Sequence, residues 1–184
     1  MIGYPSNVLV VSDYPNYRFD EDIKYRIDFV LSCGDNPYQI LEDIYKKYRK
    51  PIYAVKGNHD PSGPFPNFIK NVHYTIVQER NWLIGGWEGV LAYKSSGTGM
   101  FDDMEAAAYL TNFPYVDIFI THAPIYGKTD KEDYAHIGSE AILKYIEEHQ
   151  PKYVYHGHTH QHAGTIIGNT AVVSIYGCRI IHLG

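Results

Sequence analysis

The segment YVYHGHTH, residues 153–160, joins a short apolar run to three closely spaced histidines. The aromatic and β-branched residues at 153–155 predict a buried strand. His156, His158 and His160 come at the end of that strand. Histidine runs of this kind also occur in surface tracts, so the segment alone is only moderately specific for a metal site. Its interpretation depends on the residues at the ends of the other apolar runs.

Four other short apolar runs also end in residues that bind metals or protons. These runs cover residues 8–11, 29–31, 52–55 and 116–120. Turn chemistry explains each end when it is taken separately, because Asp and Asn beside Gly or Pro are ordinary loop residues. In layered α/β folds, however, sites form where the carboxyl ends of strands converge. Together the five ends predict one shared site, formed by Asp13, Asp35, Asn58, His59, Asp60, His122, His158 and His160.

Helical patterns separate several of the predicted strands. Residues 38–48 carry apolar side chains at three- and four-residue spacing, and residues 138–151 begin beside Ser139, a candidate N-cap. A further apolar run at 171–175 predicts another strand. Strands that alternate with helices are typical of a layered α/β fold.

Other parts of the chain show short strands with no helix between them. Residues 72–93 and 163–175 contain apolar runs interrupted by glycine, which indicates antiparallel pairing, and residues 179–183 predict a last strand. The sheets are therefore expected to be mixed. No repeat, linker or change in composition divides the chain, so we expect residues 1–184 to form a single domain.

The composition is that of a soluble globular protein. The chain has 184 residues, of which 45% are hydrophobic and 20% charged, and its formal net charge is −5. That charge does not favour binding to duplex nucleic acid, which usually needs a basic face. No apolar stretch reaches the roughly 20 residues of a membrane span. We therefore expect no membrane association, and the sequence leaves homo-oligomer formation open.

The compartment is predicted from the N-terminus and the cysteines. The first residues, MIGYPSNV, lack a basic region followed by an apolar one, so we expect no signal peptide. Cys33 and Cys178 are too few for a disulfide scaffold and suit a reducing environment. Both observations favour the cytoplasm.

The predicted site consists of carboxylate, imidazole and amide groups. These hard-to-borderline ligands suit Mn, Fe, Zn or a similar divalent ion better than a thiolate site would. A carboxylate can also bridge two ions about 3.5–4 Å apart, the spacing used for in-line displacement at phosphorus. The ligand types therefore predict a divalent-metal site and are compatible with phosphoester chemistry.

In order and context, these residues resemble the calcineurin-like metallophosphoesterase family. The family's series is D-x-H, GD, GNH[D/E], TH-x-P and GH-x-H. The corresponding segments are DYP at 13–15, GD at 34–35, GNHD at 57–60, THAP at 121–124 and GHTH at 157–160. The resemblance implies a β-sandwich of two mixed sheets flanked by helices.

The resemblance also implies a ligand set for two metal ions, with Mn favoured and Fe, Zn or Ni as alternatives. In that set one carboxylate bridges the two ions, three side chains complete the shell of one ion, and two serve the other. The bridging residue is Asp35, the three are Asn58, His122 and His158, and the two are Asp13 and His160.

By the same resemblance, the nucleophile is a metal-bound water or hydroxide and the substrate a small phosphoester. His59 faces the scissile phosphate and stabilises or protonates the leaving oxygen. Asn58 helps to bind the phosphate, and Asp60 orients His59. Asn36 comes after the GD motif where serine/threonine protein phosphatases carry D-R-G, which favours a phosphodiester or small phosphorylated metabolite as substrate.

One ligand of the family pattern is missing. The D-x-H motif places a histidine where this chain has Pro15, which offers no metal-binding side chain. Tyr14, Asn16 and Tyr17 are the nearest residues with a side-chain oxygen. The first metal position is therefore expected to have fewer protein ligands and a weaker affinity than the second.

Three functions are compatible with the sequence. A metal-dependent phosphoesterase agrees with the retained GNHD segment and its His59. A ligand-depleted, non-enzymatic metal-binding scaffold is favoured only by Pro15. A metallohydrolase for an amide or ester has the same ligand chemistry, but the GNHD arrangement weighs against it. The role of His136, which precedes the helix at 138–151, is left open between a site residue and a loop residue.

Overall fold

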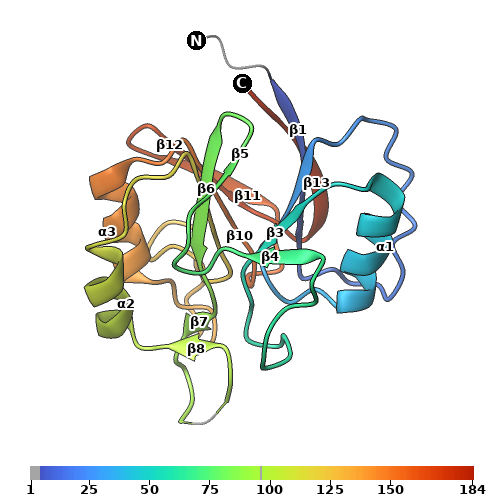
Figure 1. Ribbon diagram of the computed structural model, residues 1–184. Coiled ribbons are helices and arrows are strands. Elements are labelled where there is room, and N and C mark those ends of the chain that lie inside the picture. Colours follow the sequence, from blue (N-terminus) through green and yellow to red (C-terminus); the bar gives the residue numbers. More distant parts are fainter. Residues whose placement is uncertain (1–4, 96) are drawn as a thin grey trace.

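The computed structural model describes residues 5–95 and 97–184 and shows two β-sheets packed face to face (Figure 1). The first sheet has the strand order β13-β1-β2-β3-β4. Its strands are β1 (Ser6–Ser12), β2 (Phe29–Ser32), β3 (Ile52–Ala54), β4 (Ile69–Asn71) and β13 (Gly177–Leu183).

The second sheet has the order β11-β12-β10-β9-β6-β5. Its strands are β5 (Val77–Glu79), β6 (Trp82–Trp87), β9 (Ile118–Thr121), β10 (Tyr153–His156), β11 (Ala163–Ile167) and β12 (Thr170–Ser174). A separate short pair consists of β7 (Val90–Leu91) and β8 (Met100–Phe101). Both main sheets contain parallel and antiparallel pairs, which confirms the predicted mixed sandwich.

Helices cover the two outer faces of the sandwich (Figure 1). The first sheet is covered by α1 (Tyr38–Tyr48), and the second by α2 (Asp103–Leu110) and α3 (Glu140–His149). Three clusters of buried apolar residues correspond to the three interfaces between these layers. No helix among the described residues has the length and apolar character needed to cross a membrane.

Strand β1 shows how the sequence specifies this layered arrangement. Its residues Val8 and Val10 belong to the cluster between the sheets, whereas Leu9 and Val11 pack on the α1 side. Side chains alternate between the two faces of a strand, so a strand with apolar neighbours on both faces must be apolar throughout. The continuous run VLVV meets that requirement.

The helix ends agree with the sequence patterns where a cap is present. The Ser139 hydroxyl accepts a hydrogen bond from the Ile142 N–H at 3.1 Å, which confirms the predicted N-cap of α3. By contrast, α2 was not predicted. Its sequence DMEAAAYL has only Ala106 and Leu110 buried, so it lacks the wide apolar stripe that identifies α1 and α3.

The topology places the carboxyl ends of several strands side by side. Strands β1, β2 and β3 pair in parallel, and so do β6, β9 and β10. Parallel neighbours end at the same edge of their sheet. The polar segments after β1, β2 and β3 therefore meet those after β9 and β10 at one end of the sandwich.

Candidate metal centre

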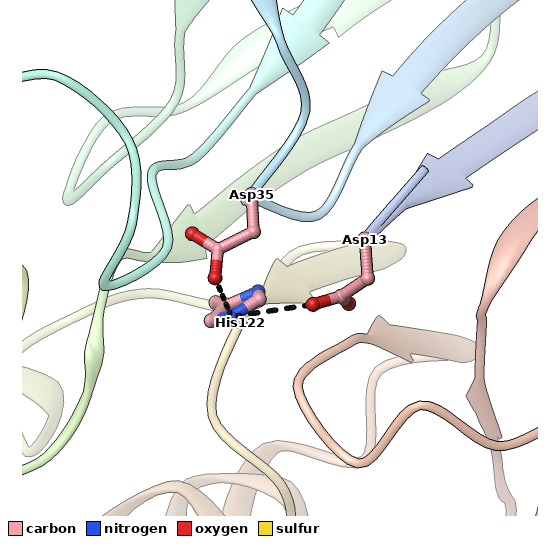
Figure 2. Close-up of side chains that lie close together, drawn as sticks. All are labelled: Asp13, Asp35 and His122. Carbon is pink, nitrogen blue, oxygen red and sulfur yellow. Dashed lines mark ion pairs between the residues drawn. The ribbon is translucent and has the colours of Figure 1, made fainter. Parts of the chain in front are cut away.

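Three of the predicted site residues form a compact group at this end of the sandwich. Asp13, Asp35 and His122 each offer one ligand atom, and these atoms lie within 4.8 Å of one another. Figure 2 shows both carboxylates directed at the His122 ring. The three residues come after β1, β2 and β9, so both sheets contribute to the group.

The His122 imidazole is held in one orientation by the backbone. Its Nδ1–H donates to the Cys33 carbonyl oxygen at 2.7 Å, which leaves Nε2 facing the carboxylates. Nε2 lies 3.1 Å from Asp35 Oδ2 and 3.9 Å from Asp13 Oδ1. Burial lowers the pKa of His122, but the charges of Asp13 and Asp35 outweigh it and raise the pKa to about 9. Without a cation at this point, a proton balances the two carboxylates.

Several buried polar atoms of this group have no hydrogen-bond partner among the described residues. They are Asp13 Oδ1 and His122 Nε2, whose contacts with each other, with Asp35 and with His160 are ion pairs, together with Asn58 Oδ1 of the neighbouring GNHD loop. Buried polar atoms are normally paired, because an unpaired one costs roughly 1–3 kcal/mol. Two of the three are oxygen acceptors and the third is an imidazole nitrogen, and all three can coordinate a divalent cation. The donor set therefore fits a metal ion.

His158 and His160 lie on either side of Asp13. The His158 backbone N–H donates to Asp13 Oδ2 at 2.8 Å, and its ring Nε2 contacts the Ala135 carbonyl oxygen at 2.8 Å. A carbonyl accepts only from an N–H, so the proton is on Nε2 and the lone pair of Nδ1 remains available. Burial and the nearby charge of His122 lower the pKa of His158 to about 4. His158 is therefore neutral, the form in which histidine binds metals.

His160 is the exposed member of the group. Its Nε2 lies 3.2 Å from Asp13 Oδ1, and 59% of its side chain is accessible to solvent. His122 is completely buried by comparison. The two histidines contact the same Asp13 oxygen from environments of very different polarity.

His136 does reach the site, although the sequence left its role open. Its ring centroid lies 4.7 Å from that of His158, and its Nδ1 is 2.6 Å from Asp133 Oδ1. The segment that carries His136 also provides the Ala135 carbonyl for His158. This segment therefore fixes the His158 ring from its outer side.

The GNHD loop lies against Asp35. The His59 backbone N–H donates to Asp35 Oδ1 at 2.8 Å, while the His59 side chain is exposed. A cavity of about 340 Å³ opens here, lined by residues that include Asp35, His59 and Asp60. The exposed His59 thus forms part of the cavity wall.

Asp60 has a structural role that the sequence did not indicate. Its Oδ2 accepts hydrogen bonds from the backbone N–H groups of Asp35 and Gly57, each at 2.8 Å. Within the described chain, no hydrogen bond joins Asp60 to the His59 ring. Asp60 therefore fixes the two loops to each other, and its predicted action on His59 remains a prediction.

The backbone at four predicted ligands has an uncommon conformation. Asp13, Asp35, His158 and His160 have φ angles of 48°, 52°, 67° and 51°, in the left-handed region. Non-glycine residues rarely adopt this region, and it concentrates at functional sites. Asp35 illustrates the result, because its N–H reaches Asp60 while its carboxylate faces His122.

Two glycines allow the backbone to approach these side chains. A Cβ atom on Gly57 would lie 2.1 Å from Asp35 Oδ1, and one on Gly157 would lie 2.0 Å from Ser12 Oγ and 2.4 Å from Asp13 Oδ2. Real Cβ atoms do not approach that closely. The glycines of the GNHD and GHTH segments are thus required by the close packing of the carboxylates.

Residues outside the predicted set also position the carboxylates. The Ser12 hydroxyl donates to Asp13 Oδ2 at 2.8 Å. The Asn36 side chain accepts from the Tyr14 N–H at 3.2 Å and donates to the Gly34 carbonyl oxygen at 3.0 Å, which joins the loops after β1 and β2. The only sequence signal for these residues is their place beside Asp13 and Asp35.

Pro15 lies at the surface, where the family pattern has a histidine. The described Pro15, Asn16 and Tyr17 are all exposed, and the hydrogen bonds and ion pairs of the Asp13 side chain involve Ser12, His158, His122 and His160 instead. Tyr14 is buried with the α1 side of the core. Among the described residues, none of the three neighbours with a side-chain oxygen replaces the missing ligand.

The fold is a sandwich of two mixed sheets with carboxylates and a histidine gathered at its strand ends. The family model described as calcineurin-like phosphoesterase matches residues 13–162 of this chain. The chain therefore belongs to the calcineurin-like phosphoesterase family. No curated protein matches it.

Solved structures of known proteins share the fold. The Mycobacterium tuberculosis phosphopantetheinyl hydrolase PptH is 12% identical with a TM-score of 0.59, and the comparison covers 98% of this chain and 97% of PptH. TT1561 of Thermus thermophilus is 18% identical with a TM-score of 0.57, over 93% of this chain and 89% of TT1561. A putative 5'-nucleotidase from Staphylococcus aureus is 13% identical with a TM-score of 0.56, over 93% of this chain and 48% of that protein.

At these identities the structural comparisons show the fold alone. Membership of the family supports a metal-dependent phosphoesterase in general and leaves the substrate unspecified. The buried Asp13, Asp35 and His122 agree with a family that binds divalent metals.

Proposed function

We propose that the chain hydrolyses a phosphodiester or a small phosphorylated metabolite at this centre. The observation that carries the proposal is the set of unpartnered buried atoms on Asp13, Asn58 and His122, at the strand ends of a calcineurin-like phosphoesterase. The adjoining 340 Å³ cavity is large enough for a small phosphoester and is lined by His59.

Two metal positions are proposed. The buried position is formed by Asp35, Asn58, His122 and His158. The open position is formed by Asp13 and His160 and shares Asp35 with the buried one. A divalent ion bound by these residues would supply a coordinated water of lowered pKa and would neutralise charge on the phosphoryl oxygens. Manganese is the ion proposed for the test, and the oxygen and imidazole donors, without thiolate, suit Fe, Zn or Ni as well.

The residues of the chain position the substrate and the leaving group. His59 is exposed beside the cavity, and its backbone N–H bond to Asp35 holds it next to the proposed metal positions. In the proposed reaction, its imidazolium donates a proton or a hydrogen bond to the leaving oxygen. Asn58 contributes its side-chain amide to the phosphate, and Asp60 holds the GNHD loop against Asp35.

The proposal also covers the setting of the reaction. The two main sheets and their covering helices form one sandwich, with the short β7–β8 pair beside it, which supports a single domain over residues 1–184. Cys33 and Cys178 are free thiols, which supports a reducing compartment such as the cytoplasm.

The experiment is hydrolysis of bis(p-nitrophenyl) phosphate with and without added Mn²⁺, for the wild type and His59→Ala. Loss of a general acid typically reduces the rate about 10²–10⁴-fold, and we expect a smaller reduction here because p-nitrophenolate leaves with little need of a proton. His182→Ala is the matched control, because His182 is an exposed histidine that contacts Asn7 near the start of β1, at the other end of that strand from Asp13. Absence of turnover with several divalent ions would overturn the proposal.

A metal-binding scaffold without activity is the second candidate, and the exposed Pro15 is the observation that favours it. In that case the buried position binds Mn²⁺ in a titration, while no phosphoester is hydrolysed at any metal concentration. The two measurements together separate the candidates.

A further inference from the structure

A second cavity lies next to the proposed centre and is not used by the residues discussed so far. It encloses about 550 Å³ between the end of β6, β8 and the first turns of α2. Two of its lining residues contact the GNHD segment or Lys56, the residue just before it. The Gly89 N–H donates to the Lys56 carbonyl oxygen at 2.7 Å, and the Cα of Gly99 faces the Gly57 carbonyl oxygen so closely that a Cβ there would lie 2.4 Å from it. The cavity therefore opens beside the proposed phosphate site.

Aromatic rings form much of the cavity wall. The Trp87 ring is nearly perpendicular to Tyr74 and to Phe101, at interplanar angles of 89° and 90°, and it lies 5.9 Å from the ring of Tyr109. Their faces thus point in several directions. Aromatic faces set around a cavity carry negative electrostatic potential and attract organic cations.

The charged residues of the wall are acidic. Glu88 and Glu105 line the cavity, and no lining residue is Lys or Arg. Neither carboxylate pairs with a Lys or Arg in the described part of the chain. The remaining basic candidate is His73, whose Nδ1 accepts the Glu88 N–H at 3.1 Å. Burial lowers the pKa of His73, and Glu88 only partly opposes this, so the ring is neutral near pH 7.

Two buried atoms of the wall have no partner among the described residues. Glu88 Oε2 is an acceptor, and Nε1 of Trp87, a residue only 5% exposed, is a donor. Both atoms are closed off from solvent, so the ligand is inferred from the wall as a whole: a cationic group complements the Glu88 and Glu105 carboxylates, and an adjoining oxygen can accept from a donor group. An aminoalkyl ester has this pair, with the ammonium two carbons from the ester oxygen.

We propose that this cavity binds the ester substituent of the substrate and selects one that carries an organic ammonium group. In this arrangement Glu88 faces the cation, the aromatic rings surround it, and the ester oxygen extends toward Asn58. The inference rests on the proposed function and names the substrate class of the same site.

The test compares two p-nitrophenyl diesters of equal shape. One carries a choline substituent, and the other carries 3,3-dimethylbutyl, in which carbon replaces the charged nitrogen. For the wild type with Mn²⁺, we expect kcat/KM to favour the choline ester by about tenfold. For Glu88→Gln the ratio falls to near one, and Tyr109→Leu lowers it in part. Glu147→Gln, on the exposed face of α3, is the matched control and keeps the wild-type ratio.

The ratio separates this inference from the proposed function. If both esters are hydrolysed equally, the phosphoesterase stands and the ammonium subsite is wrong. If p-nitrophenyl thymidine 5'-phosphate is preferred to the choline ester, the cavity binds a nucleobase and the inference is overturned. If the wild type hydrolyses none of the esters, the proposed function fails. In that case calorimetry measures the affinity of choline for the wild type and for Glu88→Gln, which tests the cavity alone. If choline does not bind, or binds both proteins with equal affinity, the inference is overturned.

Discussion

The two proposed metal positions share the Asp35 carboxylate and differ in the burial of their histidines. At the buried position, His122 is inaccessible to solvent, its ring is fixed by Cys33, and its free nitrogen faces two carboxylates. At the open position, His160 is largely exposed, and Pro15 stands where the family has a ligand. Unpaired groups are costly only where water is excluded, so the buried position has the stronger requirement for a cation.

The largest effect is expected from His122→Ala. The substitution removes a proposed ligand and leaves Asp13 and Asp35 facing each other without a positive group. Loss of even a supporting residue typically costs 10–100-fold in metal affinity, so we expect a loss of more than about 100-fold here. Calorimetric titration with Mn²⁺ measures it, and His182→Ala serves again as the control. Unchanged affinity would show that the buried position is not built around His122.

The next effect tests the close packing of the buried position. In Gly57→Ala the new methyl group meets Asp35 Oδ1, and we expect a loss of about 1–3 kcal/mol in the free energy of unfolding together with weaker metal binding. Unfolding in denaturant measures the change in the free energy of unfolding. Gly164→Ala is the control, since a Cβ at Gly164 makes one ordinary contact, 3.5 Å from the Val172 carbonyl oxygen.

The open position is tested by restoring the missing ligand. Pro15→His is expected to raise the affinity of the weaker ion by about tenfold, roughly 1.4 kcal/mol. Tyr17→His places a histidine at a nearby residue that is 85% exposed, and it should leave that affinity unchanged. Equal gains from both substitutions would mean that Pro15 does not mark the ligand position.

The smallest effect is expected at Asp117, which fixes the start of β9, the strand that His122 follows. Asp117 precedes β9 and accepts from the Leu83 N–H at 3.0 Å and the Tyr115 hydroxyl at 3.1 Å, and it pairs with Lys152 at 3.0 Å. Burial raises the pKa of Asp117, but these bonds outweigh it and lower the pKa.

The pKa of Asp117 is lower in the folded chain than in the unfolded chain. The ionised carboxylate therefore stabilises the fold at pH values above its pKa in the unfolded chain. This stabilisation is lost as the pH falls through the pKa of Asp117 in the folded chain. We expect Asp117→Asn to cost about 1–2 kcal/mol at neutral pH. The difference from the wild type should shrink below about pH 4. Unfolding curves at several pH values measure this, and a difference that does not change with pH would contradict it.

The sequence predicted the strand ends well because each apolar run is followed at once by its polar residues. It predicted the mixed sheets and the N-cap Ser139 for the same reason, since both are local patterns. The helix α2 was missed because its alanine-rich sequence has no apolar stripe of the usual width. The left-handed backbone of Asp13 and Asp35 was also missed, because that conformation depends on contacts between loops that are distant in sequence.

Local sequence patterns also fail to reveal residues that position other residues of the site. Asn36 and Asp60 join loops after different strands, and only the folded chain shows which N–H groups they bind. His136 reaches His158 because the segment before α3 folds back over the site. The cavity with Glu88 and Trp87 combines residues from β6, β8 and α2, so no local pattern indicated it.

The most direct test of this account is the metal content of the purified protein, followed by titration with Mn²⁺. The buried and open positions differ in ligands and in exposure, so we predict one tightly held ion per chain and a second that binds only at higher concentration. Two ions of equally high affinity would contradict the distinction between the positions. They would leave membership of the family unaffected.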